Sequence, residues 1–186
     1  MAIETRISEQ AYKRLVFAEP DQSWELWDGW PREKPGMTWE HSTIIVLLGH
    51  FLLLQLDRGQ HEVLAEARVR RSTGTIYIPD LVVAPTAMGA ALRGRPGTLA
   101  IFSDPLPLVV EVWSSSTGDY DIDAKIPEYQ RRGDLEIWLI HPYERSLTAW
   151  RRLANGSYEE TFYREGIVRP VALPGVEIDL AKLFDA

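Results

Sequence analysis

Three charged side chains stand where a charge is costly unless it is paired or takes part in chemistry. Glu111 is the one charge in the apolar run 107–113, and Asp80 follows a proline at the inner end of another apolar run. Lys125 lies farther along, in a segment with helical spacing. A buried carboxylate needs a cation, a metal or several hydrogen-bond donors. These three residues are therefore the first candidates for a functional site.

The chemistry open to such a set is hydrolysis. Two carboxylates from neighbouring strands can hold one divalent cation such as Mg²⁺ and leave room for water and a phosphate oxygen. A nearby ammonium can orient the attacking water and screen developing charge. Asp80, Glu111 and Lys125 therefore suit metal-assisted phosphodiester hydrolysis. The alternative is structural, with Asp80 and Glu111 each forming one half of a buried ion pair with Arg68, Arg70 or Lys125.

Strands must position the two carboxylates. The near-continuous apolar run 107–113 predicts a strand that is covered on both faces. Residues 75–84 predict a second strand with Pro79-Asp80 inside it, and the proline marks an irregularity because it cannot donate to the ladder. Residues 61–70 alternate loosely and predict a third strand, and residues 135–140 a fourth.

Helices are expected at three places. Thr38 is a plausible N-cap for a helix over about 39–56, which is apolar nearly all round and is expected to be covered on most sides. A second helix spans about 120–132 and ends at Gly133. Asp121, Lys125 and Tyr129 share one face of it, because steps of four residues line up. A short terminal helix covers 180–184.

The remaining segments complete a mixed α/β layout. Asp28-Gly29 predicts a hairpin between 24–29 and 30–34, and Asn155-Gly156 predicts one between 145–153 and 158–163. Residues 1–20 form an N-terminal arm or a short helix, and residues 85–104 form a long surface loop with at most one helical turn. The order strand, strand, helix, strand indicates a mixed α/β sheet and not an all-β barrel.

Length and composition set the frame for these elements. The 186 residues suit a single domain over 1–186, and 45% hydrophobic and 25% charged residues are typical of a globular chain. The sequence contains no cysteine, so a disulfide framework is excluded. The N-terminus lacks a signal-peptide pattern, and the apolar run 44–56 falls short of the roughly 20 residues of a membrane helix. We therefore expect a cytoplasmic protein without a membrane partner.

The charge balance bears on possible partners. The formal net charge of −7 argues against a general nucleic-acid coating protein, which would have a basic surface. An enzyme that grips phosphates through a local basic rim is still compatible with it. The arginines that could form such a rim, or that could simply be solvated surface residues, are Arg68, Arg70, Arg71, Arg93, Arg95, Arg131 and Arg132.

The order and spacing of several short motifs carry a resemblance over most of the chain, from about residue 24 to 184. They are, in order, the opening Trp24-Glu25-Leu26-Trp27-Asp28-Gly29, His41 at the start of the apolar helix, Pro79-Asp80-Leu81-Val82-Val83, residues 107–114, Ser116-Thr117, the series Asp121, Lys125 and Tyr129, Glu136-Ile137-Trp138-Leu139, and Leu173-Pro174-Gly175 before a terminal Leu-Phe. In this pattern the sequence resembles the Uma-two family of restriction-endonuclease-like proteins in the PD-(D/E)XK nuclease superfamily.

The resemblance implies a fold and a function. The implied fold is a PD-(D/E)XK restriction-endonuclease-like core, a mixed sheet flanked by helices, with hairpins near both termini. The implied function is a metal-dependent endonuclease that acts on DNA. Asp80, Glu111 and the backbone carbonyl of Val112 would bind Mg²⁺, with Mn²⁺ as a substitute, and Lys125 would position the hydrolytic water.

Two positions depart from the family pattern. Trp113 stands where the superfamily motif has a lysine two residues after the glutamate. The family places its lysine on the following helix, which Lys125 matches. His141-Pro142 replaces the usual Asp-Pro at a turn past the site.

Further residues are possible accessories of the site, each with a structural alternative. His41 could take part in catalysis or be a hydrogen-bonded core histidine. Glu40 could add a carboxylate or simply favour the helix dipole. Glu25 could approach from its hairpin, and Tyr129 could pack or touch substrate. Asp121 shares the helix face of Lys125.

Three hypotheses compete at this point. The first is a Mg²⁺-dependent DNA endonuclease, for which a homodimer is expected, because cutting both strands of a duplex commonly needs two active sites. The second is a non-catalytic nuclease-fold protein that binds a protein or nucleic-acid partner, favoured by the acidic net charge and Trp113. The third is a metal-dependent hydrolase of RNA or a small phosphodiester, since the sequence holds no helix-turn-helix, zinc finger or RNA-binding signature.

Overall fold

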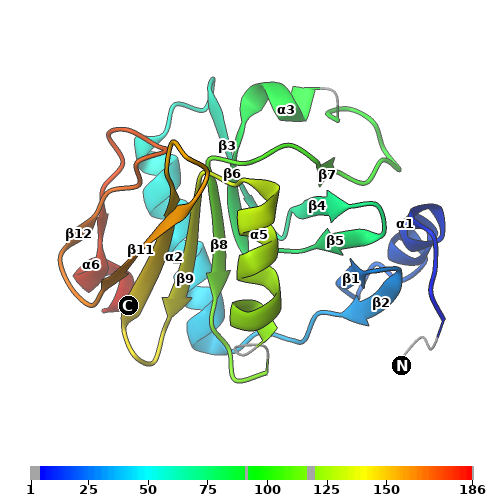
Figure 1. The fold of residues 1–186 in the computed structure, drawn as a ribbon, viewed down its shortest axis with the longest axis horizontal. Helices are drawn as coiled ribbons and strands as arrows, with labels where there is room; N and C mark the ends of the chain where they lie inside the picture. Colours follow the sequence, from blue (N-terminus) through cyan, green and yellow to red (C-terminus); the bar gives the residue numbers. More distant parts are fainter. Residues whose placement is uncertain (1–4, 91, 117–119, 186) are drawn as a thin grey trace.

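The fold is described from a computed structural model, which describes residues 5–90, 92–116 and 120–185. Its main sheet has six strands (Figure 1). Their order is β11-β10-β9-β8-β6-β3. Strands β8 and β9 run parallel and every other neighbouring pair runs antiparallel. The predicted mixed α/β fold is therefore confirmed. The bounds are β3 (His61–Ala65), β6 (Leu81–Pro85), β8 (Leu108–Val112), β9 (Glu136–His141), β10 (Ser146–Arg152) and β11 (Tyr158–Tyr163).

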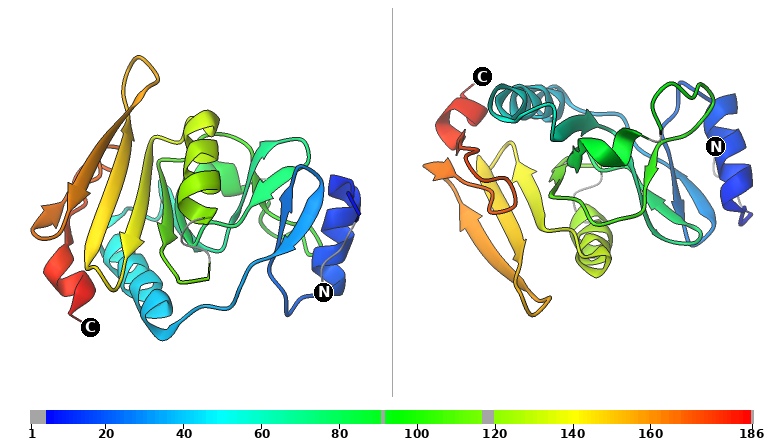
Figure 2. Two further views of the ribbon diagram at one scale, coloured as in Figure 1. Left: turned by 60° about the horizontal axis from the view of Figure 1, so that its bottom comes forward. Right: turned by 90° about the horizontal axis from the view of Figure 1, so that it is seen from above.

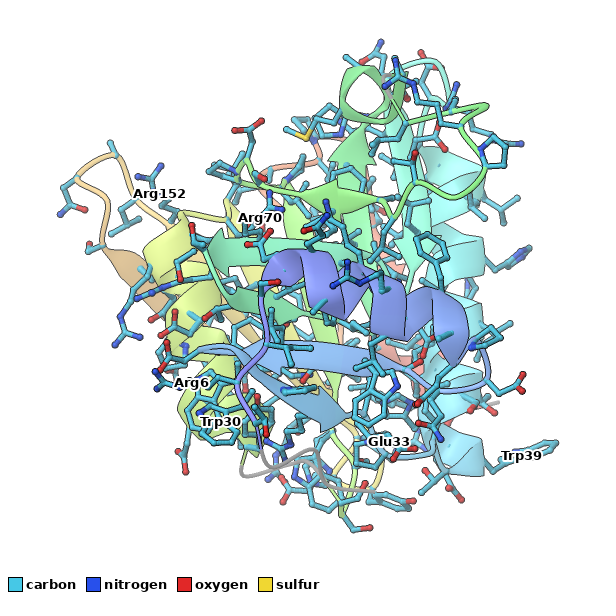
Figure 3. The ribbon with its side chains drawn as sticks, turned by 90° about the vertical axis from the view of Figure 1, so that its right-hand side faces the viewer. Arg6, Trp30, Glu33, Trp39, Arg70 and Arg152 are labelled. Atoms are coloured by element: carbon cyan, nitrogen blue, oxygen red, sulfur yellow. The ribbon has the colours of Figure 1, made fainter. Side chains whose placement is uncertain are left out.

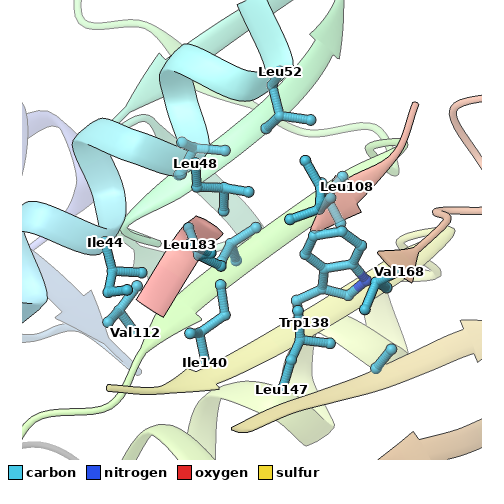
Figure 4. Packing of buried hydrophobic residues seen from close by; sticks show 14 of the residues in the cluster. Ile44, Leu48, Leu52, Leu108, Val112, Trp138, Ile140, Leu147, Val168 and Leu183 are labelled. Atoms are coloured by element: carbon cyan, nitrogen blue, oxygen red, sulfur yellow. The ribbon is translucent and has the colours of Figure 1, made fainter. Parts of the chain in front are cut away.

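Helices α2 (Trp39–Gln55) and α5 (Ile126–Arg132) cover opposite faces of this sheet, as the view from above in Figure 2 shows. Successive strand residues point to alternate faces. In β8, Val110 and Val112 join the core cluster under α2, whereas Val109 joins the cluster under α5. Both faces are buried, which explains the near-continuous apolar sequence of β8. Figure 4 shows the α2 side, where Ile44, Leu48 and Leu52 of the helix face strand residues that include Val112, Trp138 and Ile140.

A second sheet of five strands, in the order β2-β1-β5-β4-β7, stands beside the first (Figure 1). Its bounds are β1 (Trp24–Trp27), β2 (Trp30–Glu33), β4 (Arg68–Ser72), β5 (Thr75–Tyr77) and β7 (Ile101–Phe102). The predicted β1–β2 hairpin is confirmed. Its turn residues Asp28 and Gly29 have φ values of 47° and 82°, the left-handed pair that a type I′ turn requires. Helix α1 (Glu9–Ala18) packs on this sheet through Tyr12, so the N-terminal segment is a helix that is attached to the core.

Two of the predicted strands are wrong, each for the same reason. Residues 61–70 divide into β3 and β4, and residues 75–84 divide into β5 and β6, with one strand of each pair in each sheet. The chain crosses between the sheets at both points, and alternation of apolar residues does not record such a crossing. The second crossing is Ile78-Pro79-Asp80, which places Asp80 at the junction of the two sheets.

Helix α2 begins as predicted but is only partly covered. The Thr38 hydroxyl accepts a hydrogen bond from the His41 amide at 3.3 Å, which confirms the N-cap. The opposite face of the helix is exposed, with Trp39 84%, Val46 70% and Leu54 71% accessible. Trp39 projects away from the body of the protein in Figure 3. The expectation that neighbouring elements cover this apolar helix on most sides is therefore wrong.

The helix predicted over 120–132 has two parts. A π-helical turn, η1 (Asp121–Lys125), precedes α5, and Pro127 stands in the first turn of α5. Proline is tolerated there because the first amides of an α-helix lack intrahelical partners. Gly133 ends α5 in the left-handed conformation, with φ 85°, as predicted.

The remaining elements lie outside the site. Helix α3 (Thr86–Ala90) and strand β7 occupy parts of the predicted loop 85–104, and the β10–β11 hairpin is confirmed. Helix α6 (Leu180–Phe184) matches the predicted terminal helix, and β12 (Ile167–Val168) pairs with β13 (Ile178–Asp179). Within the described residues, no helix has the length and apolar character needed to cross a bilayer.

Candidate active site

Asp80 is held between the two sheets by three hydrogen-bond donors. Its side chain is 1% exposed. Oδ1 lies 2.7 Å from Lys34 Nζ, and Oδ2 lies 3.0 Å from His41 Nε2 and accepts a hydrogen bond from the Val112 amide at 2.7 Å. Pro79 sits directly before it, at the break between β5 and β6, where a missing amide donor breaks no ladder. The proline therefore marks the site.

Glu111 is the single carboxylate inside β8 and is also 1% exposed. The Tyr129 hydroxyl donates to its Oε1 at 2.5 Å, and Lys125 Nζ lies 3.3 Å from the same oxygen. Residues Lys125 and Tyr129 therefore do share the helix face that the four-residue spacing predicted. Lys125, with 2% of its side chain exposed, reaches the strand carboxylate.

Glu25 joins the cluster from the N-terminal hairpin. It is buried on β1, and its Oε1 accepts a hydrogen bond from the Ile78 amide at 2.9 Å. The same oxygen lies 3.0 Å from Lys125 Nζ. Lys125 therefore bridges two buried carboxylates, Glu25 and Glu111, that come from different sheets.

Lys34 is the site residue that the sequence analysis missed. Its Nζ contacts Asp80 and also donates to the Ile78 carbonyl at 3.1 Å, with 8% of the side chain exposed. A signal was available in the hairpin register. Glu25 pairs with Arg32 across β1 and β2, so both side chains lie on one face, and Lys34 follows Arg32 by two residues.

The charges of the cluster shift the pKa of two members. Burial alone would raise the pKa of Asp80, but the hydrogen bond with His41 and the charge of Lys34 hold it well below its usual range. Burial would lower the pKa of Lys34, but the charges of Asp80 and Glu111 outweigh it, so this pKa is raised. Asp80 and Lys34 are therefore both charged near neutral pH.

His41 acts as a donor to Asp80. Because the Asp80 carboxylate is ionised and can only accept, Nε2 must carry the proton of their 3.0 Å contact. The other ring nitrogen, Nδ1, is buried and has no hydrogen-bond partner among the described residues. His41 thus positions Asp80 from the first turn of α2.

Two other candidate accessory residues are not seen at the site: one lies away from it, and the side chain of the other is not described by the structure. Glu40 is exposed on α2 and accepts a hydrogen bond from the Tyr143 hydroxyl at 3.0 Å, away from Asp80 and Glu111. The backbone of Asp121 lies in η1, and its side chain is outside the described part of the structure, as is Thr117.

The two departures from the family pattern contact each other. The ring of Trp113 stacks on that of His141, with centroids 4.2 Å apart and planes 20° apart. Tyr143 meets the Trp113 ring edge-on at 6.0 Å. An aromatic cluster therefore stands where the superfamily motif has a lysine, while the ammonium groups of the site come from Lys34 and Lys125.

The basic clusters are engaged in ion pairs. Arg70 pairs with Glu9 at 2.7 Å, Arg71 with Glu128 at 2.5 Å and Arg132 with Asp134 at 2.8 Å. Two further arginines of these clusters have acidic partners, Arg93 with Glu62 and Arg131 with Glu128. Arg68 donates to the Tyr12 hydroxyl. Most of these arginines thus have acidic partners within the fold, and the basic rim that would grip phosphates stays a prediction.

The carboxylates Asp80 and Glu111 line one small pocket of about 10 Å³ with Lys34, His41 and Lys125. Hard oxygen donors on neighbouring strands are the ligand type that Mg²⁺ prefers, and Mg²⁺ commonly uses one or two carboxylates while keeping waters. The Val112 amide faces Asp80, and in a strand the carbonyl of the same residue points to the same edge. The donor set therefore fits a hard divalent cation in type, although within the described residues no three histidine or acidic side chains form a ready metal cluster.

A comparison with solved structures shows the fold class of the protein. A crystal structure described as "a putative nuclease belonging to DUF820" from Anabaena variabilis has 20% sequence identity to this chain and a TM-score of 0.77. The alignment covers 96% of this chain and 98% of the other. The chain therefore has the mixed, helix-flanked fold of restriction-endonuclease-like proteins, as predicted.

The family follows from a second comparison. The model of the Uma2 family, described as "Putative restriction endonuclease", matches residues 9–181. The chain belongs to this family, which confirms the resemblance. No match was found among curated proteins.

Proposed function

We propose that this protein is a metal-dependent endonuclease that hydrolyses phosphodiester bonds in DNA. The observation that carries the proposal is the convergence of Asp80, Glu111 and Lys125 on one pocket, from three separate elements. Membership of the Uma2 family supports nuclease chemistry in general. The choice of DNA over RNA or a small phosphodiester rests on the family description alone.

Asp80, Glu111 and the Val112 carbonyl would hold Mg²⁺, with Mn²⁺ as a substitute. The cation would supply charge stabilisation to the phosphoryl oxygen and make a bound water more acidic. Lys125 would orient the hydrolytic water, since its Nζ is fixed between Glu25 and Glu111 at 3.0 and 3.3 Å. Glu25 and Tyr129 would act as positioning residues for Lys125 and Glu111.

A homodimer forms part of the proposal, because two sites are needed to cut both strands of a duplex in one encounter. The exposed face of α2 is the surface we assign to the second copy. Its residues Trp39, Val46, Leu53 and Leu54 are apolar, and residues 42–56 contain no Asp, Glu, Lys or Arg. A chain with net charge −7 repels its own copy, so a surface without charged residues is favoured for self-pairing over the acidic parts of the molecule.

One observation favours the non-catalytic alternative. The ionised groups of the cluster already satisfy one another, Asp80 with Lys34, and Glu25 and Glu111 with Lys125. Such a network would also suit a nuclease-fold protein that binds a partner and uses the old site as a structural ion pair. That alternative predicts no Asp80-dependent binding of Mn²⁺ and no cleavage.

The test is cleavage of supercoiled plasmid, linear duplex and single-stranded DNA by purified protein in Mg²⁺ and then Mn²⁺. Asp80→Asn keeps the shape of the side chain and removes its charge. The matched control is Asp21→Asn, the same substitution at an exposed position before β1. Each variant is checked by circular dichroism before use.

Cleavage by the wild type and by Asp21→Asn that is lost in Asp80→Asn supports the proposal. Cleavage that persists in Asp80→Asn shows that the activity belongs to a different site or to a contaminant. An RNA substrate in the same series separates the DNA assignment from the ribonuclease alternative.

A further inference from the structure

Lys34 occupies the position beside Asp80 that a cation would need. Its Nζ lies 2.7 Å from Asp80 Oδ1 and donates to the Ile78 carbonyl at 3.1 Å. Lysine is rarely buried unless it is paired, and here 8% of the side chain and 1% of its partner's are exposed. The two groups therefore form a desolvated ion pair and not a surface contact.

The remaining oxygen of Asp80 is also occupied. Oδ2 accepts hydrogen bonds from His41 Nε2 and from the Val112 amide. These donors fix the orientation of the carboxylate. At the other oxygen, Oδ1, the ammonium group of Lys34 is in direct contact with Asp80. A second cation at Oδ1 would stand within a few ångströms of the ammonium, where like charges repel strongly at low dielectric.

The space left beside Lys34 is about 10 Å³, which corresponds to roughly one water molecule. A bound Mg²⁺ ion usually keeps several waters, so a hydrated cation needs more space than the pocket offers while Lys34 lines it. Lys34 has a path out, because it begins the segment that joins β2 to α2. Gly36 in this segment has open space around the position of a Cβ, and Met37 is 45% exposed.

We propose that Lys34 is a built-in cation that competes with the divalent metal for Asp80, so that metal binding requires Lys34 to leave the carboxylate. The inference rests on the proposed metal site. Lys125 differs, because two carboxylates from two sheets hold it and a metal shared with Glu111 need not displace it. Lys34 thus lowers the metal affinity of the resting protein and links metal binding to movement of the β2–α2 segment.

The experiment measures Mn²⁺ affinity by isothermal titration calorimetry, without substrate. Lys34→Met removes the competing charge at similar length, and Lys34→Gln keeps a donor for Asp80 if the methionine variant folds poorly. Lys182→Met is the matched control, since its side chain is 74% exposed on α6. Asp80→Asn tests whether the binding belongs to this site.

We expect the Lys34 variants to bind Mn²⁺ at least tenfold more tightly than the wild type, about 1.4 kcal/mol, with Lys182→Met unchanged. Equal or weaker binding by the Lys34 variants, together with loss of binding in Asp80→Asn, overturns the competition and leaves the proposed function standing. Mn²⁺ binding that is unchanged in Asp80→Asn, or that is undetectable in the wild type and in the Lys34 variants, overturns both the competition and the proposed metal site.

A second measurement uses the wild-type chain. The sequence has four lysines, Lys13, Lys34, Lys125 and Lys182. Acetylation of each is followed by mass spectrometry with and without Mg²⁺. Release of Lys34 from Asp80 predicts that Mg²⁺ increases its modification while Lys125 stays protected and the exposed Lys13 and Lys182 do not change. A Lys34 that is equally protected at saturating Mg²⁺ contradicts the inference.

Discussion

Replacing Lys125 by methionine removes the cation that two buried carboxylates share. Methionine keeps an unbranched chain of similar volume, so packing against α5 is largely retained. Glu25 and Glu111 then lose their common partner, which stands 3.0 and 3.3 Å away, and both side chains are at most 3% exposed. Breaking a buried ion pair by removing one partner costs about 3–5 kcal/mol, because the remaining charge is uncompensated.

That magnitude is measurable in a protein of this size. A change of 1 kcal/mol shifts the melting temperature of a domain of this length by about 2–4 °C, so Lys125→Met is expected to lower it by roughly 6–20 °C. Urea denaturation gives the free energy of unfolding directly. Adding Glu111→Gln to Lys125→Met should recover part of the loss, because it removes one of the uncompensated charges.

The control is Lys182→Met, which breaks an exposed contact of 3.9 Å with Asp179 and should change stability by less than about 0.5 kcal/mol. If Lys125→Met costs no more than this control, the charges at Glu25 and Glu111 are not held by Lys125 and the reasoning fails. If Glu111→Gln deepens the loss, the two substitutions do not share an electrostatic cause.

Three other outcomes follow from the same geometry. Val46→Lys on the exposed face of α2 should weaken the dimer affinity at least tenfold, measured by sedimentation equilibrium. The control Ala154→Lys, at an exposed position in the β10–β11 turn, should leave this affinity unchanged. A wild type that is monomeric at all concentrations refutes the interface. The pKa of Asp80 is lowered in the folded state, so its stabilisation is complete above about pH 5 and is lost as the pH falls below that value. The free energy of unfolding, measured by urea denaturation between pH 5 and pH 2, should therefore change less with pH for Asp80→Asn than for the wild type. Combining Asp80→Asn with Lys34→Met should restore stability to within about 1 kcal/mol of the wild type, although Asp80→Asn alone costs about 3–5 kcal/mol.

The elements that the sequence predicted well are those with a local cause. The β1–β2 turn follows from Asp28-Gly29, the start of α2 from Thr38 and the end of α5 from Gly133. The apolar run of β8 follows from burial on both faces. The predicted strands 61–70 and 75–84 were wrong because the chain changes sheets within them, and a change of sheet depends on packing partners that are distant in sequence.

The same distinction applies to the candidate site. Glu111 could be found because a carboxylate inside an apolar strand is conspicuous, and Asp80 because it follows a proline within an apolar run of the sequence. Lys125 could be found because four-residue steps on a helix are regular. The hairpin register places Lys34 on the face of Glu25 and Arg32. Lys34 was nevertheless missed, because it lies just past the strand, at the start of a proline- and glycine-rich connection, and the register alone does not show that this face is buried. Its partnership with Asp80 depends on how the hairpin sheet docks on the main sheet, 46 residues farther along the chain.

The energetics of the cluster bear on the choice between catalytic and structural roles. Well-packed apolar side chains of similar volume commonly stabilise a core as much as a buried ion pair does, so stability alone does not account for Lys34, Asp80, Glu111 and Lys125 together. Charges that met a binding partner directly would have to be accessible to it. They face a pocket of about 10 Å³ instead, which admits roughly one water molecule and no side chain of a second protein. The alternative in which the charges only pair with one another is distinguished by its lack of Asp80-dependent Mn²⁺ binding. Charges arranged around a space of that size suit the chemistry of a water and a metal ion, which is what the nuclease hypothesis requires.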